Sequence, residues 1–158
     1  MPQARSQTEP PQDNKYADMV ANCACFHLRK ASRTVTQLFD QILAPCGLRS
    51  TQLTILLAAK VVGPCGLARL ARELVMDRST ITRNLLPLVK QGYLKVSGSN
   101  GRSGKSVEIT AIGMRALATA EPYWNEAQNR LVNRVGHPRW NHMMGELTHV
   151  VDSSRASS

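Results

Sequence analysis

The sequence has no long apolar run and no leader segment. None of its apolar stretches is long enough to span a bilayer, and no charged segment followed by an apolar one opens the chain. These absences predict a soluble, cytoplasmic protein with no membrane partner. The length of 158 residues suits one domain, or one domain with dimerising arms, and leaves no room for a separate catalytic unit.

The groupings of residues that catalysis requires are also missing. No nucleophile, base and orienting group can be assembled from the sequence, and no glycine-rich loop follows a buried strand. We therefore expect the protein not to be an enzyme and to carry no cofactor.

Acidic residues are scarce, with 11 against 20 Lys and Arg and a net charge of +9. Residues 60–110 hold nine of the basic residues and three of the acidic ones, so six of the nine excess charges lie there. A polyanionic partner would concentrate charge in this way, and nucleic acid or an acidic membrane surface both qualify.

Within residues 66–110 the sequence predicts two short helices, a sharp turn and a hairpin in succession. Apolar residues at intervals of three and four give the first helix one apolar stripe. They are Leu67, Leu70, Ala71 and Leu74. After a turn at Val75-Met76, Asp77 is expected to cap the second helix, because its carboxylate can accept the free amide of Ser79 or Thr80.

The second helix is predicted to bury Ile81, Leu85 and Leu88 and to leave a short, polar and basic face outside, which also carries Leu86. A helix, a short turn and a second helix that begins with hydroxyl residues and an arginine are typical of a helix-turn-helix. The second helix of that motif enters the DNA major groove N-terminus first. We therefore predict that the major groove is contacted by Ser79, Thr80, Thr82, Arg83 and Asn84.

A hairpin is predicted directly after this helix. Residues 93–97 and 107–110 alternate apolar and polar side chains, which is typical of antiparallel strands. The facing apolar residues would be Leu94, Val96, Val107 and Ile109. The intervening loop is polar and glycine-rich and suits a phosphate backbone. We expect a wing in which Arg102 and Lys105 contact the minor groove or its phosphates.

The segments on either side of the helix-turn-helix and wing are predicted to form the dimer. The expected divisions are a disordered arm (1–15), an N-terminal dimerisation helix (16–48, helical from Tyr16 to Leu43), a winged helix-turn-helix domain (49–112), C-terminal dimerisation helices (113–152) and a polar tail (153–158). Both outer segments are too long and too apolar on one side to pack only against so small a centre. A twofold homodimer would cover them, presenting two recognition helices about 34 Å apart to a pseudo-palindromic operator.

The chain resembles the MarR family of bacterial transcription regulators. The resemblance covers residues 18–152, and its specific motifs are Leu70–Leu74, Asp77–Arg83, Leu88–Leu94 and Val107–Gly113. It implies a mainly α, winged helix-turn-helix fold, dimeric through interlocked N- and C-terminal helices. The family's wing usually carries an Asp-Arg pair near its tip. In this chain the corresponding residues are Asn100-Gly101-Arg102, so the arginine is present but the carboxylate that would orient it is not.

The resemblance also implies regulation. Such proteins commonly lose DNA affinity when a small, often aromatic or phenolic, acid binds between the dimer helices and the DNA-binding lobe. The residues that could serve an anionic ligand are His27, Arg29, Arg33, Arg115 and Trp124. We therefore expect a repressor that is released by such a ligand or by cysteine oxidation.

Four cysteines, Cys23, Cys25, Cys46 and Cys65, are expected to be free thiols in a reducing compartment. On one helix Cys23 and Cys25 would point about 200° apart and could not pair or share an ion. Cys23 and His27, four apart, share a face, for which core packing is the favoured interpretation. The alternative is an effector or redox site with Arg33, in which an oxidised cysteine bridges to the partner chain.

No metal site is predicted. His142, Glu146 and His149 share a helix face, but an exposed polar face explains them without a metal, because no fourth ligand can be named. The main alternative function is a nonspecific architectural DNA-binding protein, although such proteins usually display apolar wedges, and the wing tip offers only Gly, Ser and Asn beside its charges.

Overall fold

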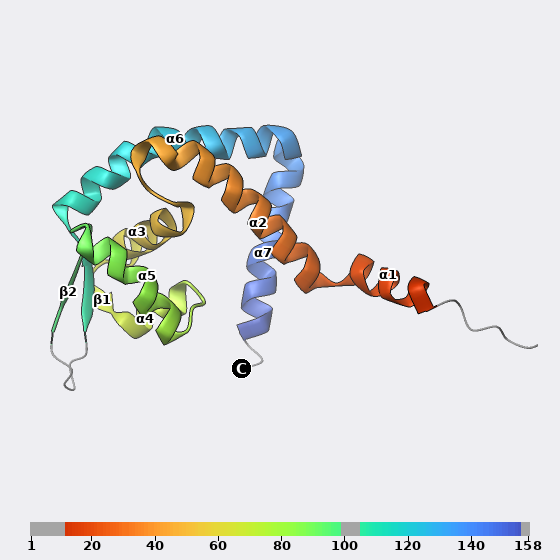
Figure 1. The fold of residues 1–158 in the computed structure, drawn as a ribbon, viewed down its shortest axis with the longest axis horizontal. Coiled ribbons are helices and arrows are strands. Elements are labelled where there is room, and N and C mark those ends of the chain that lie inside the picture. Colours follow the sequence, from red (N-terminus) through yellow and green to blue (C-terminus); the bar gives the residue numbers. More distant parts are fainter. Residues whose placement is uncertain (1–11, 99–104, 156–158) are drawn as a thin grey trace, which may run out of the picture. The chain divides into compact units, whose positions relative to one another are not determined.

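A computed structural model of the chain describes residues 12–98 and 105–155 (Figure 1). It divides the chain into two compact units, residues 1–37 and 38–158, with the division inside one helix. The predicted tip of the wing, with Arg102, lies outside the described residues, as does most of the predicted N-terminal arm.

The first unit contains α1 (Gln12–Asn22) and the first part of α2 (Ala24–Leu43). The single helix predicted from Tyr16 to Leu43 is wrong, because the chain leaves helical geometry at Cys23. Local hydrogen bonds hold the break: the Cys23 thiol accepts the backbone N–H of Phe26 at 3.4 Å, in the manner of a helix N-cap. At the end of α1, the Asn22 side chain donates to the Asp18 carbonyl at 2.9 Å.

The second unit holds the predicted helix-turn-helix and hairpin. Its helices are α3 (Ser50–Val62), α4 (Leu67–Glu73) and α5 (Arg78–Lys90). Among the described residues, an antiparallel sheet has the order β1-β3-β2, formed by β1 (Cys65–Gly66), β3 (Ser106–Ile109) and β2 (Leu94–Ser97). The predicted winged helix-turn-helix is confirmed.

The hairpin register is the predicted one, with Leu94 opposite Ile109 and Val96 opposite Val107. The sequence analysis did not predict the short strand β1, which precedes α4. Cys65 pairs with Val107, and the Leu67 amide donates to the Lys105 carbonyl at 3.2 Å. These bonds join the start of α4 directly to the base of the wing.

One apolar core unites these elements. Its largest fully buried side chains are Leu43, Ile55, Leu56, Leu70, Ile81, Leu88, Leu94 and Val107. They come from the end of α2, from α3, α4 and α5, and from both strands of the hairpin. Each such residue contributes about 1.5–3 kcal/mol through burial, so the core fixes the outer face of α5 by holding its inner face.

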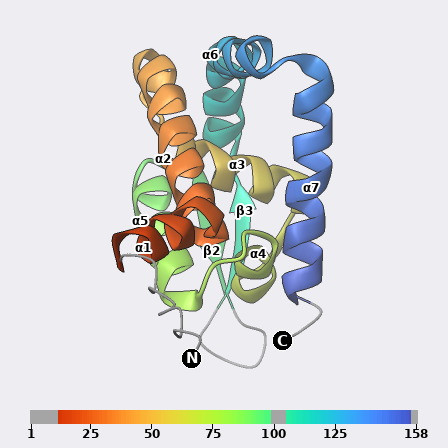
Figure 2. The same ribbon diagram turned by 90° about the vertical axis from the view of Figure 1, so that its right-hand side faces the viewer.

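Beyond the wing, α6 (Ala111–Val135) and α7 (His137–Arg155) complete the second unit (Figure 2). Thr110 caps α6 by accepting the Gly113 amide at 3.0 Å, and Gly136 ends the helix with φ 88°. The last helix, which ends at Arg155, continues into the predicted polar tail. No single helix among the described residues is long and apolar enough to cross a membrane, although the bent pair 24–46 and 50–62 together passes that test by length and composition.

Candidate nucleic-acid interface

The turn between α4 and α5 is a hydrogen-bonded helix ending. The Val75 amide donates to the Arg72 carbonyl at 3.2 Å, and the Met76 amide donates to the Ala71 carbonyl at 2.9 Å. These two bonds form a Schellman motif, which requires a left-handed residue between them. Val75 takes that place with φ 50°, and the chain therefore reverses within a few residues.

Asp77 fixes the start of α5. Its Oδ1 accepts the Thr80 amide at 2.8 Å and the Ser79 hydroxyl at 2.6 Å, while its Oδ2 accepts the Thr80 hydroxyl at 2.6 Å. The predicted N-cap is confirmed. The Ser79 hydroxyl, followed by the Thr80 hydroxyl and amide, holds the pKa of the Asp77 carboxyl far below its usual range. The carboxylate therefore stays charged and orients both hydroxyl groups.

The outer face of α5 is defined by the side chains opposite its buried ones. Ile81, Leu85 and Leu88 are buried as predicted. Ser79, Thr82, Arg83 and Leu86 are exposed, whereas Thr80 and Asn84 are half-buried. We call Ser79, Thr82, Arg83 and Leu86 the outer face of α5.

Some polar side chains on or near this face are already hydrogen-bonded within the protein, and Arg83 is not. The Thr82 hydroxyl donates to the Arg78 carbonyl at 2.6 Å, and the Asn84 amide group donates to the Met76 sulfur at 3.8 Å. The Arg83 guanidinium has no hydrogen-bond or ion-pair partner among the described residues. Arg83 is thus an exposed cation near the middle of α5 that can bind an anionic or acceptor ligand.

The base of the wing lies next to the end of α5. Gly92 ends that helix in a second Schellman motif, in which the Tyr93 amide donates to the Leu88 carbonyl at 2.9 Å. Lys95 on β2 and Lys105 at the start of the return strand are exposed. Neither lysine forms an ion pair with another described residue, so α5 and the base of the wing each present exposed positive charge.

The candidate effector residues Cys23, His27 and Arg33 all lie in the first unit, and all three are exposed. Core packing of Cys23 and His27 within the chain is therefore wrong. The His27 ring instead meets the Ala21 carbonyl at 2.9 Å and stands edge-on to Phe26. Because Cys23 lies outside the helix, the 200° separation predicted for Cys23 and Cys25 does not apply.

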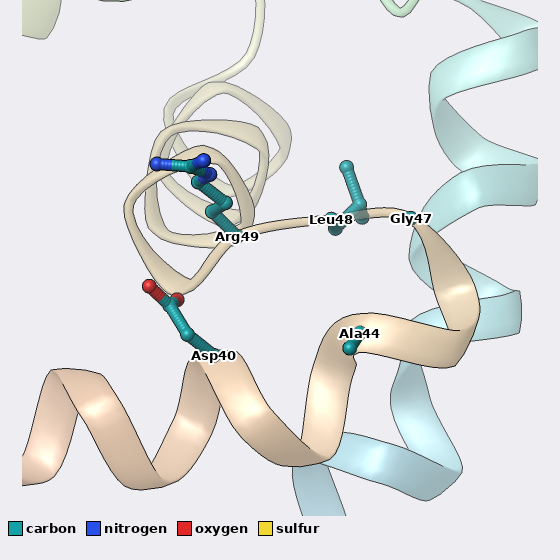
Figure 3. A pocket seen from close by; sticks show the side chains of 5 residues that line it. All are labelled: Asp40, Ala44, Gly47, Leu48 and Arg49. Carbon is teal, nitrogen blue, oxygen red and sulfur yellow. The ribbon is translucent and has the colours of Figure 1, made fainter.

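A cavity of about 500 Å³ lies at the corner between the end of α2 and the start of α3 (Figure 3). The 3-10 helix η1 (Ala44–Cys46) forms part of the corner. The lining residues are Asp40, Ala44, Gly47, Leu48 and Arg49, so none of the predicted effector residues lines it. Asp40 points at the start of α3 and accepts the Ser50 amide at 2.7 Å, which gives its carboxylate a structural role.

Side chains that could bind a metal do not cluster in the part of the chain that the structure describes, where no group of three or more His, Cys, Asp or Glu is suitably arranged. His142 and Glu146 are exposed on α7, and the neighbouring His149 ring contacts the Ser153 hydroxyl at 3.4 Å.

Comparison with solved structures identifies close likenesses over almost the whole described chain. The transcriptional regulator MosR of M. tuberculosis, solved in complex with DNA, is 31% identical with a TM-score of 0.72, over 85% of this chain and 99% of that one. CouR of Rhodococcus jostii RHA1 bound to a 23-mer DNA duplex is 20% identical with a TM-score of 0.74, over 84% and 95%.

The oxidised form of MarR from E. coli is 16% identical with a TM-score of 0.66, over 81% of this chain and 93% of that one. At the identities of CouR and MarR the likeness concerns the fold alone, whereas MosR is a relative in sequence as well. No family model and no curated protein matches the chain.

Proposed function

We propose, because this chain belongs to the MarR family of transcriptional regulators, that it is a homodimeric repressor that binds a pseudo-palindromic operator in double-stranded DNA. The observation that carries this proposal is the outer face of α5. Three buried residues on the opposite side hold this face outward, Asp77 caps the N-terminus of the helix, and Arg83 supplies a cation with no ion-pair partner among the described residues. MosR and CouR, which share the fold, were each solved on DNA.

The residues divide into two roles at the DNA. In this proposal Ser79, Thr80, Thr82, Arg83 and Asn84 contact the major groove. The half-buried Thr80 and Asn84 would make positioning contacts rather than the deepest ones. Arg102 and Lys105 on the wing contact the minor groove or its phosphates. Arg83 has the reach and the donors to bind a guanine edge, which makes it the main source of sequence discrimination.

Dimerisation is supported by apolar side chains that the single chain leaves exposed. In the first unit these include Tyr16 (63%) and Met19 (59%), and on α7 they include Val150 (46%). A second copy that covers them would place two α5 helices roughly 34 Å apart, one duplex turn. The protein would then act in the cytoplasm, where its operator lies, and would perform no catalysis.

Substitution of Arg83 by Ala tests the proposed reading role. We expect Arg83→Ala to weaken operator binding by about 1–3 kcal/mol while changing the affinity for a random duplex much less. Fluorescence anisotropy on both duplexes at one fixed salt concentration measures the two losses. Arg130→Ala, which removes a cation already paired with Glu126 at 3.0 Å, is the matched control.

The same measurement separates repressor from architectural protein. A repressor prefers its operator over bulk DNA, whereas an architectural protein binds both alike. If Arg83→Ala lost the same affinity for both duplexes, Arg83 would not contribute to sequence discrimination. An absence of operator preference in the unaltered protein would leave the architectural alternative as the better one.

Release from DNA is proposed to follow either an acidic ligand or cysteine oxidation. CouR was also crystallised with p-coumaroyl-CoA, and MarR of E. coli was crystallised in an oxidised form. In this chain the observation that favours oxidation is the exposure of Cys23 and Cys25 at a break between helices. His27 and Arg33 on α2 supply the polar groups for an anionic effector.

Oxidation is tested with hydrogen peroxide, which can take two electrons and two protons from a pair of thiols, forming one S–S bond and water. We expect peroxide to lower the operator affinity of the unaltered protein at least tenfold and a thiol reductant to restore it. Cys23→Ser should abolish the response, whereas Cys46→Ser should keep it. Persistence of the response in Cys23→Ser would exclude this thiol as the sensor.

A further inference from the structure

We infer that Leu86 is a specificity-determining residue that recognises the C5-methyl group of a thymine in the operator. This inference rests on the proposed function and deepens it, because it assigns a sequence preference to a residue outside the predicted polar contacts. The juxtaposition that carries it is one large apolar side chain, 64% exposed, that shares the outer face of α5 with Ser79, Thr82 and Arg83.

The position of Leu86 on the helix is fixed by its neighbours. Ser79, Thr82, Arg83 and Leu86 are spaced i, i+3, i+4 and i+7, so they share one face of an α-helix. Helices that read the major groove use side chains at this same spacing. At 100° per residue, Leu86 lies within about 20° of the direction of Ser79 and nearly opposite the buried Leu88. Leu86 therefore points where Ser79 and Arg83 point.

Leu86 is well separated from Ser79 along the helix. Seven residues at a rise of 1.5 Å put the two side chains roughly 10 Å apart along the axis of α5, which is comparable to the length of three base-pair steps of 3.4 Å, so the two side chains would not meet the same base. The helix continues for one more turn after Leu86 and ends at Lys90, which is exposed and carries a positive charge. Leu86 therefore lies along the helix between two exposed cations, Arg83 and Lys90.

The chemistry of the major groove indicates which DNA group the Leu86 side chain would contact. Base edges in the major groove present hydrogen-bond donors and acceptors, with one apolar group among them, the C5-methyl group of thymine. A leucine offers no hydrogen bond and would leave donors or acceptors unsatisfied against any other edge. Contact with a thymine methyl removes apolar surface of both groups from water, which favours thymine at that position.

The test replaces single thymines of the operator by deoxyuridine, which lacks only the methyl group and keeps the hydrogen-bonding edge. The operator is first obtained by selection from random duplexes with the unaltered protein. We expect at least one fixed thymine in each half-site whose replacement weakens binding by about fourfold, the change that corresponds to one buried methyl group. Leu86→Ala should bind the thymine and deoxyuridine duplexes equally at that position.

Two comparisons make the result specific. Val61→Ala, which trims an apolar residue that is 84% exposed on α3, should keep the full response to deoxyuridine. Circular dichroism and thermal unfolding check that Leu86→Ala is folded, and its affinity for random duplexes checks that general DNA binding persists.

The inference is overturned if no thymine replacement matters to the unaltered protein, or if Leu86→Ala responds to each replacement as the unaltered protein does. Either result leaves the proposed repressor function standing, because operator preference is measured in the same titrations. Failure to select any preferred duplex would instead count against the proposed function itself.

Discussion

At the scale of single residues, the same helix ending occurs twice in this protein with different residues at its left-handed position. Gly92 ends α5 with φ 73°, and Val75 ends α4 with φ 50°. Glycine adopts that region without cost, whereas a β-branched side chain there is strained by about 1–2 kcal/mol. The turn of the helix-turn-helix is thus imposed on Val75 by the packing of the helices on either side.

Replacement of Val75 by a residue that tolerates positive φ should stabilise the protein. We expect Val75→Asn to raise the free energy of unfolding by about 1 kcal/mol, because asparagine reaches the left-handed region at lower cost and Val75 is already 65% exposed. Urea titration measures the change. Val61→Asn, at an exposed position inside a helix, should not stabilise, and equal gains in both variants would contradict the strain explanation.

The residues of the interface were predicted with unequal success, for a physical reason. The Asp77 cap follows from a local spacing of three residues, and it is present in the structure. The partial burial of Asn84 depends on contact with Met76, which lies before the helix and was not predictable from periodicity. Leu86 was predicted to share the outer face, and its exposure is confirmed.

At the scale of elements, one junction joins the reading helix, the wing and α6. The Thr110 hydroxyl donates to the Gly92 carbonyl at 2.6 Å and accepts the Gly113 amide, while the Thr110 amide donates to the Tyr93 carbonyl at 3.0 Å. Gly113 is buried in this junction. A Cβ there would overlap the carbonyl oxygen of Tyr93 and would lie 2.8 Å from Ile109 Cγ1. The backbones approach closely because residue 113 has no side chain.

Gly113→Ala should therefore destabilise the protein even though alanine is the better helix former. We expect a loss of about 1–3 kcal/mol or more, since Tyr93 contributes backbone atoms that cannot rotate away. Gly145→Ala on α7 is the matched control, because nothing lies within 4 Å of its added Cβ. The free energy of unfolding of Gly145→Ala should rise by about 0.5–1 kcal/mol, because alanine has the higher helix propensity. If thermal unfolding showed both variants to be stabilised, or both destabilised, the steric argument would be contradicted.

Helix boundaries show where local sequence signals fail. Thr110 and Gly136 stand at the two ends of α6, and residues of these types mark helix ends in a sequence because capping involves neighbouring residues. The break at Cys23 had no proline or glycine to mark it, and a thiol is a weak acceptor that propensity rules do not count as a cap. The short β1 exists only because β3 offers it a partner, so a two-residue segment carried no pattern of its own.

At the scale of the whole molecule, the charge of +9 should govern how salt affects DNA binding. Each phosphate neutralised by a Lys or Arg releases condensed counterions, which steepens the fall of affinity with salt. Lys105 is exposed at the base of the wing, and Arg139 lies beyond the far end of α6. The 25 residues of α6 separate the two ends by about 37 Å.

Lys105→Ala should flatten the plot of log affinity against log salt concentration by about 0.9, with a similar loss for operator and random duplexes. Arg102→Ala should act in the same way if the wing meets phosphates. Arg139→Ala removes the same charge far from the wing and should leave the slope unchanged. Equal slopes for Lys105→Ala and the unaltered protein would exclude a phosphate contact at Lys105.

The sequence by itself determined the order of the helices, the cap at Asp77, the hairpin register and the family, because each depends on local spacing or on short motifs. Only the tertiary structure decided that Val75 is forced into a left-handed turn, that Cys23 interrupts a helix, that Cys65 joins the sheet and that Gly113 admits no side chain. The break at Cys23 depends on a local thiol contact that propensity rules do not include. The other three features arise where segments distant in sequence pack together, and the periodicity of either segment alone does not contain that packing energy.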